Sequence, residues 1–274
     1  MHAFSFFLAV FAATALGIFG YVAATFSLMR GHTAKRGLWA SLRAALRETF
    51  WIVLTQPLLP LYFFFGRRMG RGDGQPVVFV HGYMQNRANF LGLARALTRA
   101  HVGPLYGFNY PFTSDIVTSA KRLARFIEDV CRETGRPQVD LVAHSLGGLV
   151  ALEYMHSDEG RASVRRCVTV ASPHAGVTWR GPVIGLAGTQ MRQGGVYLKE
   201  RAERVLGIPT LSIFSTHDNI VHPPATSALA GRGGVDFEVR DLGHLAILFA
   251  PEVAAEVTRF LRAPGGAEKN ATGV

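Results

Sequence analysis

The stretch Val139-Asp140-Leu141-Val142-Ala143-His144-Ser145-Leu146-Gly147-Gly148 decides the fold. Its first half is a short, mostly apolar run, which is typical of a strand buried on both faces of a parallel sheet. Its second half places a serine between small residues. Small neighbours suit a tight strand–turn–helix connection, in which the serine adopts a strained conformation with its hydroxyl exposed. We therefore predict a strand, a sharp turn at Ser145, and a helix that begins directly after it.

Strand-like and helix-like segments alternate on both sides of this stretch. Helices are expected at 86–100, from 113 or 114 to 135, after residue 145, and at 252–261. The predicted strands are 77–80, 105–108, 139–143, 167–171, 209–214 and 237–239. Such alternation predicts a mostly parallel sheet with helices on both faces. The predicted fold class is therefore α/β, with a six-stranded sheet.

Three polar residues follow the ends of predicted strands and form a candidate catalytic triad. These are Ser145, Asp218 and His244. Ligands bind beyond the carboxyl ends of the strands in open parallel sheets, and the chain order Ser, Asp, His is one of the known triad orders. Singly, Asp218 would suit a turn and His244 would suit a surface. Their joint placement predicts a nucleophile, an orienting acid and a general base.

A candidate oxyanion hole follows from the same pattern. The loop after the first strand, Val80-His81-Gly82-Tyr83, is placed to supply one backbone N–H group, and the residue after the nucleophile supplies the other. By position these donors are Tyr83 and Leu146.

Other histidines near the motifs fit the role of general base less well than His244. His81 is expected to be structural, and His144 to point away from the nucleophile. His174 is placed near the mouth of the site, and His222 is a weaker candidate base. Histidines and acids do not occur at metal-ligand spacing such as H-E-x-x-H, so we expect neither a metal nor a cofactor.

The N-terminal segment is apolar. Residues 3–29 contain no charged side chain, which exceeds the roughly 20 residues that a helix needs to cross a bilayer. We predict a transmembrane anchor. A cleaved signal peptide is the alternative, because Ala13-Thr14-Ala15 fits a cleavage site, but no Lys or Arg precedes the apolar stretch.

A basic segment follows, and then a second apolar run. Residues 30–48 have apolar side chains at helical spacing, which predicts an amphipathic helix that lies on the membrane surface or packs on the catalytic domain. The run 50–66 contains Gln56, Pro57 and Pro60, so it crosses the membrane, lies in the interface, or enters the membrane and returns to the same side. The positive-inside rule places the basic segment in the cytoplasm. The side on which the catalytic domain lies then depends on residues 50–66.

The net charge of +10 supports this arrangement more than it supports nucleic-acid binding. Eight basic residues and a single acid, Glu48, lie between Arg30 and Gly72, next to the apolar runs. This pattern suits anionic head groups, and we expect no nucleic-acid partner. Cys131 and Cys167 form no disulfide framework and are expected to be ordinary buried thiols.

Four motifs together resemble the small bacterial triacylglycerol lipases of the α/β-hydrolase superfamily. They are Val-Val-Phe-Val-His-Gly at 77–82, Ala-His-Ser-Leu-Gly-Gly at 143–148, Ser-Thr-His-Asp-Asn-Ile-Val at 215–221, and Leu-Gly-His-Leu-Ala-Ile-Leu at 242–248. The resemblance covers about 75–262 and implies an α/β-hydrolase fold that hydrolyses carboxylic esters, with lipids or acylglycerols favoured. Enzymes of this family also tolerate alanine at the position of Ala143 in the serine motif. The resemblance implies that Ser145 is the nucleophile, Asp218 the acid, His244 the base, and Tyr83 and Leu146 the oxyanion donors.

The expected organisation has three parts. Residues 1–72 form a membrane anchor and a basic amphipathic region, residues 73–263 form the catalytic domain, and residues 264–274 form a disordered tail. The excursion 176–207 is either a lid or a surface insertion. The expected location is a bacterial inner membrane, and the expected partners are an ester or lipid substrate and the membrane itself. A thioesterase, amidase or acyltransferase on the same triad, and a non-catalytic membrane-tethered module, are the alternatives.

Overall fold

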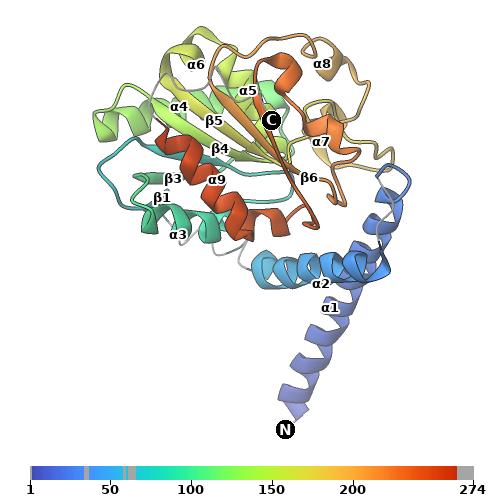
Figure 1. Cartoon of the computed structure of the whole chain (residues 1–274). Coiled ribbons are helices and arrows are strands. Elements are labelled where there is room, and N and C mark those ends of the chain that lie inside the picture. Colours follow the sequence, from blue (N-terminus) through green and yellow to red (C-terminus); the bar gives the residue numbers. More distant parts are fainter. Residues whose placement is uncertain (1, 34–36, 58–59, 61–65, 264–274) are drawn as a thin grey trace.

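A seven-stranded sheet forms the centre of the computed structural model, which describes residues 2–33, 37–57, 60 and 66–263. The strand order is β1-β3-β2-β4-β5-β6-β7 (Figure 1). All neighbouring strands are parallel except β1, which runs antiparallel to β3. The strands are β1 (Arg68–Gly70), β2 (Val77–Val80), β3 (Leu105–Phe108), β4 (Val139–His144), β5 (Val164–Val170), β6 (Thr210–Ser215) and β7 (Val235–Val239).

The predicted α/β class and mostly parallel sheet are confirmed. Each of the six predicted strands corresponds to one of β2 to β7, within a few residues at the ends. The seventh strand, β1, was not predicted, because three residues with the sequence Arg-Met-Gly carry no strand pattern. It lies before residue 73, so the sheet includes residues from the segment that we assigned to the N-terminal region.

Helices cover both faces of the sheet (Figure 1). Helices α3 (Leu91–Arg99) and α9 (Pro251–Arg262) bury their apolar sides against one face, and α4 (Ile116–Thr134) and α5 (Leu146–Met155) against the other. The shorter α6 (Asp158–Ser163) follows α5. Both cysteines are free thiols on the α4–α5 side, with Cys167 buried and Cys131 half-buried. Strand β2 is buried along its whole length, which explains its unbroken apolar sequence.

Local sequence signals set the ends of α4. The side chain of Asp115 accepts a hydrogen bond from the Thr118 N–H at 2.8 Å and so caps the helix. Gly135 ends it in the left-handed conformation, with φ of 65°. Helix α4 ends at Gly135, as predicted, but it begins later than expected, because its cap is Asp115 and not Thr113 or Ser114. It packs on the face of the sheet that α5 also covers.

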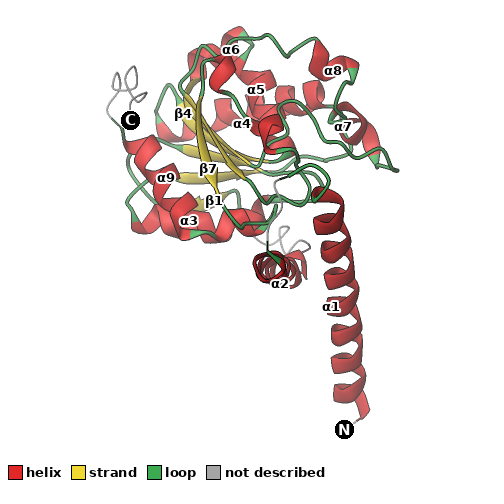
Figure 2. Ribbon diagram, turned by 45° about the vertical axis from the view of Figure 1, so that its right-hand side comes forward, coloured by secondary structure: helices red, strands yellow, loops and turns green. Residues whose placement is uncertain are grey.

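Two N-terminal helices lie on one side of the domain. They are helix α1 (His2–Met29) and helix α2 (Leu38–Thr55). Figure 2 shows that they lie crosswise, with α2 seen end-on while α1 runs down the page. Three side chains from the end of α1 pack with two alanines of α2: Val22, Phe26, Met29, Ala44 and Ala45. The ring of Trp51 stacks on Phe249 with centroids 3.8 Å apart. Helix α2 thus packs on the domain, one of its two expected placements.

The rest of α1 projects away from the domain. The described part of the chain holds one helix that is long and apolar enough to cross a membrane, Ala9–Met29, and this test does not separate an anchor from a signal sequence. Helix α2 takes up the start of the second apolar run, while most of residues 58–65 and the expected tail 264–274 lie outside the described residues.

Candidate active site

Ser145 occupies the turn between β4 and α5 in a strained backbone conformation, with φ of 53° and ψ of −124°. Residues other than glycine rarely adopt a positive φ, so the surrounding structure must hold this turn in place. The Ser145 N–H donates to the carbonyl oxygen of Val170 at 2.9 Å. A side chain at Gly147 would collide with the backbone of Val80. The small residues of the motif therefore let α5 begin directly against the end of β2.

The three predicted triad residues lie in one hydrogen-bonded chain. The Ser145 Oγ lies 2.9 Å from His244 Nε2, and His244 Nδ1 lies 2.9 Å from the Asp218 Oδ2. The other carboxylate oxygen of Asp218 accepts from the N–H groups of Ile220 and Val221 at 2.8 and 2.7 Å. Asp218 is thus fixed by its own turn, and its free edge faces the ring of His244.

Burial and charge act in opposite directions on His244. His244 is 8% exposed and Ser145 is 6% exposed. Burial alone lowers the pKa of His244, but the charge and hydrogen bond of Asp218, together with the charge of Glu48, outweigh it and raise the pKa above its ordinary value. This environment favours an imidazole that accepts a proton and remains stable as the imidazolium.

The predicted oxyanion donors lie beside the serine. Leu146 is the first residue of α5, so its N–H has no acceptor within the helix. The loop that carries Tyr83 also approaches closely, since a side chain at Gly82 would sit 2.9 Å from the Ser145 Cβ. The Gly82 N–H itself donates to the Gln85 side chain at 3.1 Å. The loop at Gly82 and the start of α5 therefore approach Ser145 from two different elements, and the predicted donors Tyr83 and Leu146 are the residues next in sequence to these contacts.

The backbone of His244 is held by neighbouring side chains. Its N–H donates to Asn219 Oδ1 at 3.0 Å, and its carbonyl oxygen accepts from His144 Nε2 at 2.9 Å. The next two N–H groups donate to Glu48 of α2. The ring of His144 thus bonds to the His244 backbone through one nitrogen, and its other nitrogen lies 2.8 Å from Gln85 Oε1.

The remaining candidate histidines lie elsewhere. His81 is buried against Tyr110, where burial lowers its pKa to about 4, consistent with the predicted structural role. His174 was expected near the mouth but is buried 3.0 Å from Thr169 Oγ1. His222 stacks on His32 at the end of α1. Only His244 contacts the serine hydroxyl among these residues.

The excursion 176–207 lies over the oxyanion loop and contains α7 (Gly185–Gln190) and α8 (Val196–Lys199). The Tyr83 hydroxyl donates to the Ile184 carbonyl oxygen at 2.8 Å and accepts from the Ile184 N–H at 2.7 Å. The two hydrogen bonds hold the excursion to the loop that carries the predicted oxyanion donor Tyr83.

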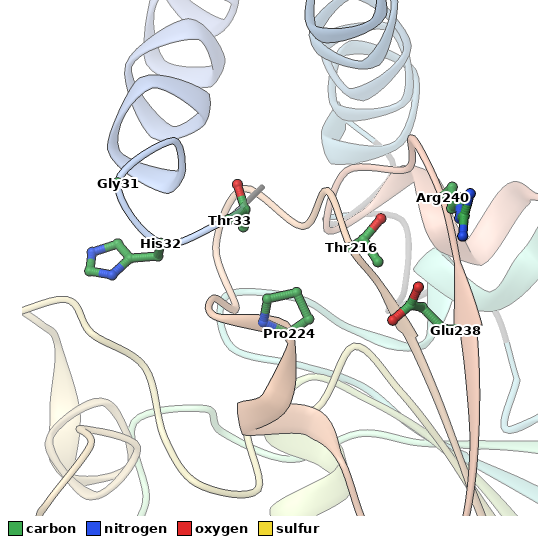
Figure 3. A pocket seen from close by; sticks show the side chains of 7 residues that line it. All are labelled: Gly31, His32, Thr33, Thr216, Pro224, Glu238 and Arg240. Carbon is green, nitrogen blue, oxygen red and sulfur yellow. The ribbon is translucent and has the colours of Figure 1, made fainter. Parts of the chain in front are cut away.

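A crevice of about 540 Å³ lies outside the triad, at the junction of the N-terminal helices and the domain. Figure 3 shows its lining side chains below the two helices, and none of them belongs to the triad: Gly31, His32, Thr33, Thr216, Pro224, Glu238 and Arg240.

In the part of the chain that the structure describes, no group of three or more His, Cys, Asp or Glu side chains is arranged to hold a metal.

Sequence reasoning missed the residues that support His244. Asn219 follows Asp218 directly and Gln85 follows the oxyanion loop, so proximity to the motifs was the available signal. Glu48 is the single acid of the basic segment, and its helical spacing places it off the predicted apolar face, so the sequence offered no signal for its burial. The apolar face predicted for this helix consists of Leu38, Leu42, Ala45, Leu46, Thr49 and Val53. It is correct in part: Leu38 and Leu46 are exposed, the other four are buried or half-buried, and the buried side also contains Glu48.

Comparison with solved structures reveals similar folds at low sequence identity. Lipase B of Aspergillus fumigatus superposes with a TM-score of 0.61 at 18% identity, over 71% of this chain and 53% of that one. The chain thus spans about half the length of that lipase. The mature lipase BlEst2 of Bacillus licheniformis superposes with a TM-score of 0.58 at 15% identity, over 70% and 93%. The product of the gene lin2722 of Listeria innocua superposes with a TM-score of 0.55 at 17% identity, over 71% of this chain and 96% of that one.

A sequence family agrees with these structures. The family described as "Alpha/beta hydrolase family" matches residues 77–204, which include β2 to β5 and the serine turn. This match covers part of the chain, and the strand order and the turn at Ser145 agree with it. The chain has an α/β-hydrolase fold, which it shares with the lipase structures above.

Proposed function

We propose that this protein is a serine hydrolase that cleaves carboxylic esters, with Ser145 as nucleophile, His244 as general base and Asp218 as the orienting acid. The observation that carries the proposal is the continuous hydrogen-bonded chain from Ser145 Oγ through His244 to Asp218, with 2.9 Å at each step. A serine hydroxyl is a weak nucleophile unless a base removes its proton, and this geometry provides that base.

The reaction has two acyl-transfer steps. His244 takes the proton of Ser145 as the oxygen attacks the ester carbonyl, and the N–H groups of Tyr83 and Leu146 receive the developing oxyanion. The alcohol leaves with the proton from His244, and an acyl-serine remains. Water then gives a proton to His244 and attacks the acyl carbon, and His244 returns a proton to the Ser145 oxygen as the carboxylic acid is released. No cofactor takes part in these steps.

The surroundings of the site favour lipid or acylglycerol esters. Large apolar side chains are exposed on the oxyanion loop and on the excursion above it, namely Met84, Trp179, Ile184 and Leu186. Exposed apolar patches often mark contact with lipid or apolar ligands. Two of the similar structures are described as lipases, in agreement with this substrate class. The excursion 176–207 would serve as a cover over the acyl chain.

The N-terminal region supports attachment to a membrane through α1. The first part of this helix, from His2 to Tyr21, would span about 30 Å at the rise of an α-helix, close to the thickness of a bilayer core. Its last two turns pack against α2. The division into residues 1–72 and 73–263 remains part of this proposal, and a signal sequence is the alternative for α1.

The domain would face the cytoplasm of a bacterial cell. Glu48 of α2 and Thr25 near the end of α1 both bond to loops of the catalytic domain, so the basic segment and the domain lie on the same side. The positive-inside rule assigns short basic segments to the cytoplasm. Labelling of a cysteine introduced at an exposed position, Glu252, by an impermeant reagent in intact spheroplasts would contradict this orientation.

The decisive experiment compares the full-length protein with Ser145→Ala in detergent micelles, on p-nitrophenyl esters of increasing acyl length. We expect hydrolysis that depends on Ser145 and increases toward long chains. Wild-type activity in Ser145→Ala would refute the nucleophile. A thioester and amide panel, with an alcohol acceptor, separates an ester hydrolase from a thioesterase, amidase or acyltransferase. Absence of both turnover and fluorophosphonate labelling in folded protein would favour a non-catalytic module.

A further inference from the structure

An acidic side chain of the N-terminal helix α2 accepts two hydrogen bonds from the loop that carries His244. Glu48 of α2 accepts from the Leu245 N–H through Oε1 and from the Ala246 N–H through Oε2, both at 2.8 Å. We propose that Glu48 is a positioning residue for the general base, so that the N-terminal helices complete the active site in addition to anchoring it. The inference rests on the proposed function of Ser145 and His244.

The two-point contact fixes the direction of the loop. Leu245 and Ala246 begin the short helical turn Ala246–Phe249, and N–H groups at the start of a turn have no acceptor within it. A carboxylate that accepts from both at once defines the position and the orientation of the backbone. Hydrogen bonds to an ionised acceptor are stronger than neutral ones. The residue directly before this pair is His244, so the constraint acts one peptide unit away from the base.

Glu48 is buried, so its two hydrogen bonds to the loop are shielded from water. The residue is 2% exposed, and burial, together with the negative charge of Asp218, raises the pKa of Glu48 to about 7, against the opposing effect of the two N–H groups and of His244. Burying a carboxylate is unfavourable unless the site compensates it. The carboxylate and His244 therefore influence each other's charge, and the pKa of His244 is raised partly by Glu48.

The packing around Glu48 leaves the carboxylate little freedom. A side chain at Gly243 would sit 2.5 Å from Glu48 Oε2 and 3.1 Å from Asn219 Oδ1, so this glycine allows both acceptors to approach the loop. On the following turn of α2, Trp51 stacks on Phe249 at the other end of the helical turn. Helix α2 therefore holds both ends of the segment that follows His244.

Helix α1 holds the same loop through a second route. Asn219 Nδ2 donates to the Thr25 Oγ1 at 2.8 Å, while Asn219 Oδ1 accepts from the His244 N–H at 3.0 Å. Near this contact, the ring of Phe26 meets His217 edge-on at 5.4 Å. The backbone before His244 is thus tied to α1, and the backbone after it is tied to α2.

The test uses the full-length protein in nonionic micelles, with rates normalised to active sites titrated by a fluorophosphonate. The variants are Glu48→Gln, which removes the charge at nearly constant shape, and Glu48→Asp, which keeps the charge but shortens the reach. The matched control is Glu252→Gln, which removes a carboxylate from the exposed first turn of α9. The measurements are kcat, KM and the pH profile of kcat/KM.

For Glu48→Gln we expect kcat to fall at least tenfold with little change in KM, and the acid limb of the pH profile to move to lower pH as His244 loses a neighbouring negative charge. Glu48→Asp should lower kcat while the acid limb stays near that of the wild type. Glu252→Gln should behave as the wild type.

Two results separate the inference from the proposed function. Wild-type kcat and acid limb in Glu48→Gln, with Ser145→Ala inactive, would overturn the positioning role and leave the hydrolase intact. A loss confined to the number of titratable sites, with kcat per site and acid limb unchanged, would assign Glu48 a merely structural role and also overturn it. Absence of Ser145-dependent turnover in the wild type would refute the hydrolase instead.

Discussion

The stability of the protein should depend on pH through Glu48 in a direction opposite to that of most paired carboxylates. Its pKa is raised from 4.5 to about 7 by burial. The folded state therefore holds the Glu48 proton at pH values where the unfolded chain has released it. By linkage, this group makes the folded state less stable as pH rises through the window from about 4.5 to about 7.

The magnitude follows from the two pKa values. At 1.36 kcal/mol for each pKa unit, the difference corresponds to about 3 kcal/mol of unfolding free energy lost between the two ends of the window. In a domain of this size, roughly 2–4 °C of Tm accompanies each kcal/mol. The wild type should therefore lose about 6–12 °C of Tm relative to Glu48→Gln as pH rises from about 4 to about 8.

Thermal unfolding of both proteins in the same micelles, followed by circular dichroism, measures this difference. Buried histidines such as His81 also titrate, but they are common to both proteins and cancel in the comparison. Parallel Tm curves across the pH range would refute the reasoning. A wild type that gains stability relative to Glu48→Gln with rising pH would show that the Leu245 and Ala246 N–H groups stabilise the carboxylate more than burial destabilises it.

Three further outcomes are expected. Asp218→Asn should lower kcat by about 10⁴ with the fold intact, because a neutral amide leaves the imidazolium unsupported and allows the wrong tautomer; a loss under tenfold in steady-state ester hydrolysis would contradict this. Tyr83→Phe removes both hydrogen bonds to Ile184, so limited proteolysis within 176–207 should accelerate, and an unchanged cleavage rate would show that packing alone holds the excursion. Arg165→Met removes the guanidinium that hydrogen-bonds to the 1% exposed carboxylate of Asp140, so urea unfolding should report about 1–3 kcal/mol less stability, and an unchanged free energy of unfolding would disprove the role of the pair.

The sequence by itself determined six of the seven strands and the positions of the three candidate catalytic residues. Unbroken apolar runs such as Val77–Val80 are strands because both faces are covered, and Gly135 ends α4 where the sequence predicts. The serine turn is also local, since the small residues around Ser145 are what the tight connection requires. The acid and the base could be predicted as well, because the ends of parallel strands meet at one edge of a sheet.

Only the tertiary structure decided what supports the candidate catalytic residues. Glu48 lies 197 positions from Leu245, and Thr25 lies 194 positions from Asn219, so no local pattern links them. The helical spacing in the basic segment predicted an amphipathic helix and part of its buried face, but it did not predict that Glu48 is buried as well. Periodicity indicates which side of a helix is apolar. The partner groups that make a buried charge tolerable become known only when distant segments meet. Strand β1 was missed for a related reason: its three residues belong to the sheet by pairing with β3 and not by their own sequence.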